Sequence, residues 1–326
     1  MKKSLVLLLA LVMVASAFLA GCSPKQEVVT EPTTAAPGEV TTEAQTVVEP
    51  EGLITVGITE ASGNFNPLYY SSAYDGYVVD MVFQGLIARN FDGEYEPSIA
   101  SSWEYSADNK SITFKMRDDV VFSDGQPLTA HDVVFTYQVL ADPSYTGRYG
   151  STVKDMVGYN EYTKGETTEF KGVVALDDYT VQFNFVEPLR VNFANCGFSI
   201  IPKHYYGKDF AVGNTSAVET ITTDAMGSGP YVVAQFKEKE LVYLERNPLY
   251  VGEGYMIKEI ILKFVDMTTD IVELTSGSVD LLAGQIEPKK ISEARNAGFS
   301  INSYNRSGYG YVKTNNQFGP TADVKV

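Results

Sequence analysis

The sequence predicts an α/β fold, because stretches with the apolar spacing of strands and of helices both occur along it. Ile112, Phe114 and Met116 alternate with polar residues, the period of two that is typical of a half-buried strand. Apolar residues between positions 77 and 86 instead recur with the spacing of one helical face. Both kinds of element are therefore expected to contribute to the folded part of the chain.

A turn and a capped helix are predicted directly after the alternating strand. Asp124 and Gly125 form a dipeptide that is typical of turns. Thr129 and Asp132 have the spacing of a helix N-cap with a capping box, and the apolar run 133–135 follows at once. We expect a hairpin that leads into a helix beginning next to Thr129.

Further strands are predicted where apolar or alternating runs meet turn residues. The aspartates at 177–178 separate two strand-like halves of the segment 173–185, and the second half alternates. The expected strands lie at 53–58, 173–185 and 257–264.

The run from 103 to 133 resembles, in residues and spacing, the signature of the family 5 extracellular solute-binding proteins. These are the peptide, dipeptide and nickel binding components of ABC importers. Three later landmarks of that family follow in its order: Gly-Ser-Gly-Pro-Tyr at 227–231, Glu-Arg-Asn-Pro-x-Tyr at 245–250 and Ser-Gly-Ser-Val-Asp at 276–280. The resemblance covers roughly residues 53–326.

The resemblance implies a two-lobed fold of the periplasmic-binding-protein type (class II) that closes on its ligand by hinge motion. An extra β-rich subdomain is then inserted in lobe one. The implied division is a lobe-one core at 52–68 plus 173–265, an inserted subdomain at 69–172, and the start of lobe two at 266–326.

The end of the sequence resembles the family's approach to a helix inside the second lobe. Asp323 has the place of an N-cap there, but only three residues follow it. A lone cap cannot nucleate a helix. We therefore expect a fragment or a truncated reading frame with an incomplete second lobe.

The first residues are typical of a bacterial lipoprotein. Two lysines precede an apolar stretch at 5–20, which is shorter than the roughly 20 residues that span a bilayer. It therefore predicts a signal peptide at 1–21. Leu-Ala-Gly-Cys at 19–22 looks like a lipobox, so Cys22 is the expected lipidation site. An ordinary signal with an incidental cysteine is the alternative.

The segment 22–51 is expected to be a disordered, acidic tether. After Cys22 it holds four prolines, six glutamates, one lysine and no aromatic residue, too little apolar surface to order itself. As a flexible coil it would reach on the order of 30 Å. We expect an extracytoplasmic head, anchored by lipid to the bacterial cell membrane.

Charge and cysteine content exclude several classes of function. The net charge of −16, with no basic stripe, argues against nucleic acid as a partner. Cys196 lies in an apolar context and is expected to be a buried, inert thiol. No Cys-x2-Cys, no His-Glu-x2-His and no acidic calcium loop occurs, so we expect neither a metal nor another cofactor.

A tyrosine-rich loop after the first strand supplies the expected ligand site. Tyrosine rings offer amphipathic contact area at low entropic cost, and small neighbours leave backbone amides accessible. By resemblance, this loop lines the cleft, where a peptide pairs main chain to main chain. The expected ligand-binding residues are Asn66, Tyr69, Tyr70, Ser71, Ser72, Ala73 and Tyr74. Packing or surface roles for the tyrosines stay open.

The resemblance implies a monomeric substrate-binding lipoprotein that delivers oligopeptides or dipeptides to the permease subunits of an ABC importer. The family's ligand-fixing residues lie largely in the second lobe. Nickel chelates, oligosaccharides and opines therefore stay open as ligands.

An enzyme would draw on His131, His204 or Ser123, but none has the spacing of a catalytic set. His131 is next to a helix cap, and His204 has no nucleophile at a readable distance. No Gly-x-Ser-x-Gly elbow occurs. We expect no enzyme. A carbohydrate-active enzyme with a carboxylate pair, and a surface adhesin or scaffold, stay open as alternatives.

Overall fold

The computed structural model describes residues 52–90, 92–253 and 257–303. The predicted signal peptide, lipidated Cys22, the tether up to residue 51 and the helix cap at Asp323 lie outside the described residues.

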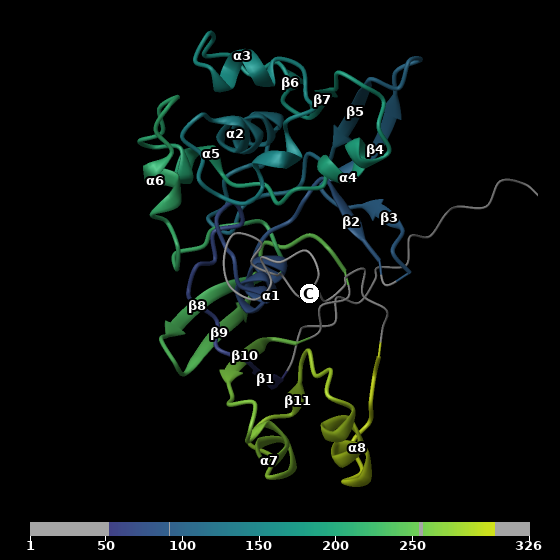
Figure 1. Ribbon diagram of the computed structural model, residues 1–326, viewed down its shortest axis with the longest axis vertical. Helices are drawn as coiled ribbons and strands as arrows, with labels where there is room; N and C mark the ends of the chain where they lie inside the picture. The colour runs from purple at the N-terminus through teal and green to yellow at the C-terminus, as the bar shows by residue number, and fades with distance from the viewer. Residues whose placement is uncertain (1–51, 91, 254–256, 304–326) are drawn as a thin grey trace, which may run out of the picture. The chain divides into compact units, whose positions relative to one another are not determined.

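A five-stranded sheet contains the first strand of the folded part and the last ones (Figure 1). Its strand order is β11-β1-β10-β9-β8. The central strand β1 pairs in parallel with both β10 and β11, whereas the pairs β10–β9 and β9–β8 are antiparallel. The strands are β1 (Leu53–Ile58), β8 (Tyr231–Lys237), β9 (Leu241–Arg246), β10 (Glu259–Phe264) and β11 (Leu281–Leu282). The strands predicted at 53–58 and 257–264 are confirmed.

The strand pairing bears on the predicted start of lobe two, which stays a prediction. Strand β11 lies within the segment 266–326 that we assigned to lobe two, yet it extends the sheet that contains β1. Helices α7 (Asp270–Thr275) and α8 (Pro288–Asn296) enclose a small core of their own beside this edge. Strands β10 and β11 lie on opposite sides of β1 and run in the same direction as it. The chain must therefore cross over between them, and α7 lies in that connection.

A four-stranded antiparallel sheet has the order β4-β5-β7-β6. Its strands are β4 (Ala100–Tyr105), β5 (Ser111–Met116), β6 (Val173–Asp177) and β7 (Thr180–Asn184), and β2 (Ile87–Arg89) pairs separately with β3 (Tyr95–Pro97). The predicted alternation and the hairpin at 173–185 are confirmed. The expected boundary between residues 172 and 173 falls between β5 and β6 of this sheet, and the domain division stays a prediction.

Helix α2 (Ala130–Ala141) packs against β6 and β7 of the four-stranded sheet. It begins after Thr129 with the predicted capping box, in which the Thr129 N–H donates to the Asp132 carboxylate at 2.9 Å. The remaining short helices are η1 (Gly150–Thr152), α3 (Tyr159–Thr163), α4 (Val191–Asn195), α5 (Lys203–Tyr206) and α6 (Ser216–Glu219).

Helix α1 (Ala73–Val82) begins and ends earlier than the helix that we predicted over 77–86. The Ser72 side chain accepts an N–H of the first turn and so caps the helix. Phe83 is extended, with φ −116° and ψ 157°, which ends it. Leu86 is fully buried but lies outside the helix. Its apolar side chain fits the helical spacing only by coincidence, because it belongs to the core.

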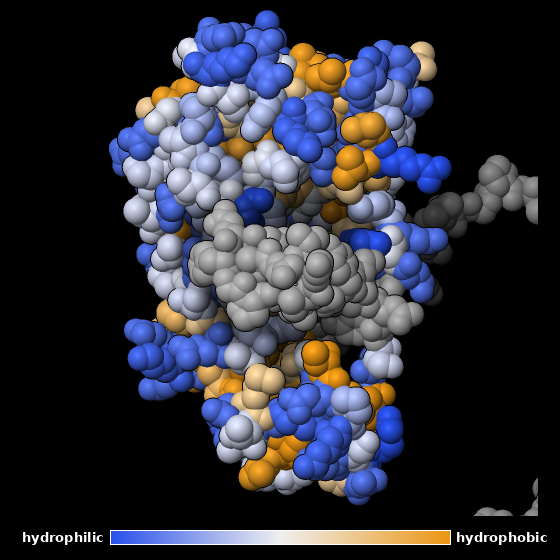
Figure 2. Space-filling model, in the orientation of Figure 1, coloured by the Kyte–Doolittle hydropathy of each residue, from blue (hydrophilic) through white to orange (hydrophobic). Residues whose placement is uncertain are grey.

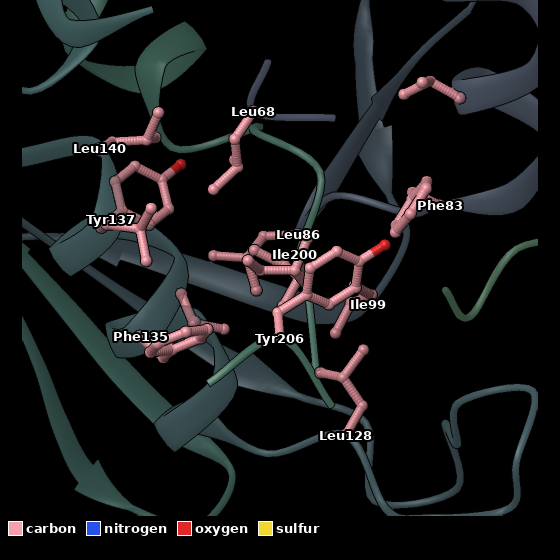
Figure 3. Close-up of a cluster of buried hydrophobic side chains, with 14 of the residues drawn as sticks. Leu68, Phe83, Leu86, Ile99, Leu128, Phe135, Tyr137, Leu140, Ile200 and Tyr206 are labelled. Carbon is pink, nitrogen blue, oxygen red and sulfur yellow. The ribbon is translucent and has the colours of Figure 1, made fainter. Parts of the chain in front are cut away.

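One continuous core of buried side chains draws on both large sheets and on helices α1 and α2. Figure 3 shows part of this core, in which Tyr137 and Phe135 of α2 lie near residues that are distant in sequence. The labelled side chains are Leu68, Phe83, Leu86, Ile99, Leu128, Phe135, Tyr137, Leu140, Ile200 and Tyr206.

On the face shown in Figure 2, hydrophilic residues cover much of the described surface and hydrophobic residues form separate patches. Among the helices of the described ranges, none combines the length and the apolar character that a membrane span requires.

Phe114→Ala should lower the free energy of unfolding by about 3–5 kcal/mol, because it removes a fully buried ring that packs against Phe183 at 5.6 Å. Leu176→Ala removes an exposed side chain of the same sheet and should change that free energy by less than about 0.5 kcal/mol. Denaturant titration followed by circular dichroism measures both variants. Equal losses would contradict the placement of Phe114 in the core.

Candidate functional site

A pocket lies at the carboxyl ends of the parallel strands β1, β10 and β11. Its cavity volume is about 120 Å³. In open α/β sheets, ligands bind in the crevice outside the carboxyl ends of the strands. The lining residues are Gly57, Ile58, Thr59, Tyr74, Val265, Met267, Asp270, Leu282, Ala283, Gly284, Gln285 and Ile286.

Tyr74 reaches this pocket because α1 is tied to the chain just after β1. Asp75, fully buried in the first turn of α1, accepts hydrogen bonds from the Ser62 hydroxyl at 2.6 Å and from the Gly63 N–H at 3.0 Å. Gly63 has φ +83°, and a Cβ there would lie 2.6 Å from the Phe236 ring, so only glycine fits. The first turn of α1 is thereby fixed beside the end of β1.

Apolar side chains form part of the pocket walls. Met267 and Ile286 are 54% and 85% exposed, so they offer apolar surface at the pocket. Tyr74 adds a half-buried ring that packs edge-on against Tyr77, with centroids 6.0 Å apart. Apolar walls with a few polar groups are typical of small-molecule and peptide sites.

Two of the residues predicted to bind ligand are buried and do not line the pocket. The Asn66 amide group donates to the carbonyls of Val218 at 2.7 Å and Ile221 at 3.0 Å, and it has no exposed surface. Tyr69 packs on Tyr145 with centroids 5.1 Å apart. Burial raises the pKa of Tyr69 to about 12, so the phenol stays neutral. Both side chains hold the loop in place.

Tyr70 and Ser71 contact Arg148. The guanidinium carbon lies 4.7 Å from the centroids of both the Tyr70 and Tyr149 rings, a cation–π arrangement. An Arg148 N–H also donates to the Ser71 carbonyl at 3.4 Å.

Ser72, Ala73 and Tyr74 belong to the start of α1, where Ser72 is the N-cap, and not to the loop in which we placed them. Of the seven predicted ligand residues, Tyr74 is the one that lines the pocket. The binding role of the set stays a prediction.

The candidate enzyme residues make structural contacts. The ring of His131 is exposed and lies 3.4 Å from the Asp178 carboxylate, and the ring of His204 lies 2.7 Å from the carboxylate of Asp124. Cys196 is buried as predicted, and burial raises the pKa of its thiol, which donates to the Asn192 carbonyl at 3.2 Å.

His204 also borders a second, more open depression, in which the Asp132 carboxylate already accepts backbone hydrogen bonds. Asp132 there accepts the Lys203 N–H at 2.9 Å besides capping α2. The lining residues are Gln126, Pro127, Asp132, Lys203, His204, Gly207 and Lys208. Within the described part of the chain, no group of three or more His, Cys, Asp and Glu side chains could hold a metal ion.

Sequence reasoning missed the residues after β10 and β11. Their signal is indirect: each follows a short apolar segment, and 276–280 matches a family landmark. The pocket exists because β10 and β11 flank β1 in parallel, and periodicity along one segment does not reveal its partners.

An open sheet with a pocket at the carboxyl ends of its parallel strands defines a ligand-binding α/β protein. The family model described as "Bacterial extracellular solute-binding proteins, family 5 Middle" matches residues 94–326, and the chain belongs to this family. The predicted family is thus confirmed.

Two curated relatives illustrate the range of the family. The periplasmic oligopeptide-binding protein OppA of Haemophilus influenzae is 26% identical over 264 residues, covering 77% of this chain and 48% of that protein. The nickel-binding periplasmic protein of Escherichia coli is 26% identical over 223 residues, covering 68% and 39%. The chain therefore spans half or less of the length of these relatives.

Solved structures confirm the predicted α/β fold of the periplasmic-binding-protein type. Haemophilus influenzae OppA in complex with RPPGFSPFR has a TM-score of 0.64 and 24% identity, over 75% of this chain and 48% of that one. The binding protein AgaA of A. tumefaciens R10, in complex with agropinic acid, has a TM-score of 0.60 and 20% identity, over 70% and 43%. At this level of identity the likeness concerns the fold.

Proposed function

We propose that this protein is the extracytoplasmic substrate-binding component of an ABC importer and that it captures oligopeptides. The observation that carries the proposal is the pocket at the carboxyl ends of β1, β10 and β11, in a chain of a solute-binding family. Tyr74 supplies an aromatic wall, and Met267 and Ile286 supply exposed apolar surface. Such walls suit the mixed side chains of a peptide, whose main chain can pair with the protein backbone.

A nickel chelate is the second candidate, because one relative is a nickel-binding protein. The two candidates differ in what the pocket must supply. A peptide needs apolar walls, which the described pocket provides, whereas a metal complex needs donors or charges that hold the chelate. Thermal-shift screening of the full-length protein against RPPGFSPFR and against nickel–histidine separates them.

Binding without chemical turnover is part of the proposal. The family consists of substrate-binding transport proteins. The candidate catalytic side chains make structural contacts, such as that between the His204 ring and the Asp124 carboxylate. A lipid on Cys22, which lies outside the described residues, would hold the protein at the membrane beside its permease.

Cys22→Ala should abolish incorporation of labelled lipid and release the protein from membranes, because Cys22 is the proposed acylation site. Two or three acyl chains anchor durably, at roughly 0.8 kcal/mol for each buried CH₂. Fractionation and metabolic labelling with a fatty-acid analogue measure both effects. Membrane retention of the unlabelled variant would contradict the lipid anchor.

Tyr74→Ala in the full-length protein should weaken peptide binding by about tenfold, the equivalent of 1.4 kcal/mol, because it removes an aromatic wall of the pocket. Tyr105→Ala, at an exposed tyrosine of the other large sheet, is the matched control and should bind normally. Isothermal titration calorimetry with RPPGFSPFR measures both. Equal affinity of the two variants would remove Tyr74 from the site.

His131→Ala and His204→Ala should leave peptide uptake nearly unchanged, because neither histidine borders the proposed pocket. Uptake of labelled peptide by cells that carry each variant measures this. A chemical conversion of the peptide that disappears in either variant would overturn the binding-protein proposal.

A further inference from the structure

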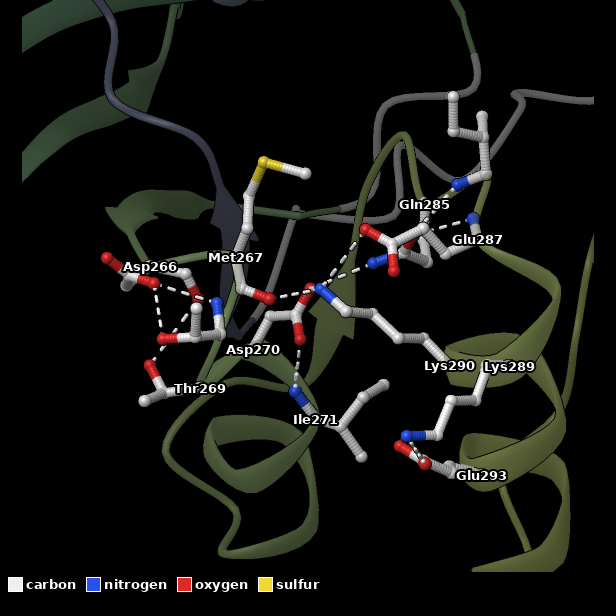
Figure 4. A network of polar contacts seen from close by, with 12 residues as sticks. Asp266, Met267, Thr269, Asp270, Ile271, Gln285, Glu287, Lys289, Lys290 and Glu293 are labelled. Carbon is white, nitrogen blue, oxygen red and sulfur yellow. Dashed lines mark hydrogen bonds and ion pairs between the residues drawn. The ribbon is translucent and has the colours of Figure 1, made fainter.

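A nearly buried ion pair joins the first residue of α7 to α8 next to the pocket (Figure 4). Asp270, after β10, and Lys290, in α8, are in contact at 2.9 Å, and their side chains are 8% and 15% exposed. Asp270 also accepts a hydrogen bond from the Gln285 amide at 2.8 Å. Asp270 and Gln285 both line the pocket.

Gln285 passes this restraint on to the loop after β11. Its side-chain oxygen accepts the N–H groups of Ile286 at 3.0 Å and Glu287 at 2.9 Å. One side chain thus ties Asp270 to the chain that carries exposed Ile286 and enters α8. These bonds restrain the backbone at Ile286, whose own side chain is 85% exposed and makes little packing contact.

Lys290 secures the opposite loop. Its ammonium group donates to the Met267 carbonyl, and it also lies 3.6 Å from the Glu287 carboxylate. Hydrogen bonding to Asp270 raises the pKa of Lys290, so the lysine is charged at neutral pH. The contacts of this one ammonium group span the loop after β10, the first turn of α7 and the cap of α8.

We propose that Lys290 and Asp270 form a brace that positions the pocket-lining loops at 266–270 and 283–287 for ligand binding. Neither residue needs to react with the ligand, and Lys290 does not line the pocket. The proposed effect on ligand rests on the proposed function, whereas the effect on the loops does not. Breaking one half of a nearly buried pair leaves the other charge unpaired, so the loops should separate.

Hydrogen–deuterium exchange of the full-length, ligand-free protein tests the brace. Lys290→Met should speed exchange in 283–287 by about tenfold and leave β10 unchanged, because the loss is local. Lys290→Arg should retain most of the protection. Lys289→Met is the matched control, because Lys289 is 88% exposed and pairs with Glu293 away from this network.

Asp270→Asn with Lys290→Met removes both charges and keeps an acceptor for Gln285, so it covers the case in which the single variant does not fold. It should still loosen the loops, because the Met267 carbonyl has lost its donor. The brace would be overturned if residues 283–287 exchanged at the wild-type rate in Lys290→Met or in the double variant.

Dissociation of RPPGFSPFR then tests the role of the brace in binding. Lys290→Met should release the peptide about tenfold faster than both wild type and Lys289→Met. A loosened loop with an unchanged dissociation rate would overturn the positioning role. If wild type does not bind the peptide, the proposed peptide function fails, while the exchange result still decides whether the brace exists.

Discussion

The parallel pairing of β1 with both β10 and β11 is the constraint on which the rest of the site depends. It brings three chain segments, far apart in sequence, to one edge of the sheet. Parallel strands cannot be joined by tight turns, so long connections must leave from that edge. The connection after β1 contains the whole four-stranded sheet, and the one after β10 contains α7. The pocket is formed by the residues at and directly after the ends of β1, β10 and β11, together with Tyr74 of α1.

Two carboxylates hold the chain segments that border the pocket in place. Asp75 fixes the start of α1 to the loop after β1, and Asp270 fixes the loop after β11 to the start of α7. Each accepts hydrogen bonds from both side chain and backbone, which compensates the cost of burying a charge. One contact positions Tyr74 and the other positions Ile286, on two different walls.

Elements with strong local signals could be predicted from the sequence, and their contacts in space could not. The alternation at Ile112 and Phe114 and the cap at Thr129 gave correct elements, because period and capping chemistry are local. Tyr69 and Tyr74 have equally suitable chemistry for a ligand, yet only Tyr74 lines the pocket. Tyr69 precedes α1, whereas Tyr74 lies in its first turn, which Ser72 caps. Domain boundaries likewise depend on strand pairing, which local periodicity does not reveal.

Other buried aspartates of the described fold fix loops in the same way. Four aspartates are nearly or fully buried, and each accepts at least one backbone N–H. The N–H of Gly63 donates to Asp75, and that of Ile271 donates to Asp270. Asp132 accepts from Thr129 and Lys203, and Asp142 accepts from Ser144 and Gly213. The described fold therefore uses these buried acids to fix loops. At the pocket, Asp270 and the Gln285 that it binds hold the loop that carries the exposed apolar side chain of Ile286.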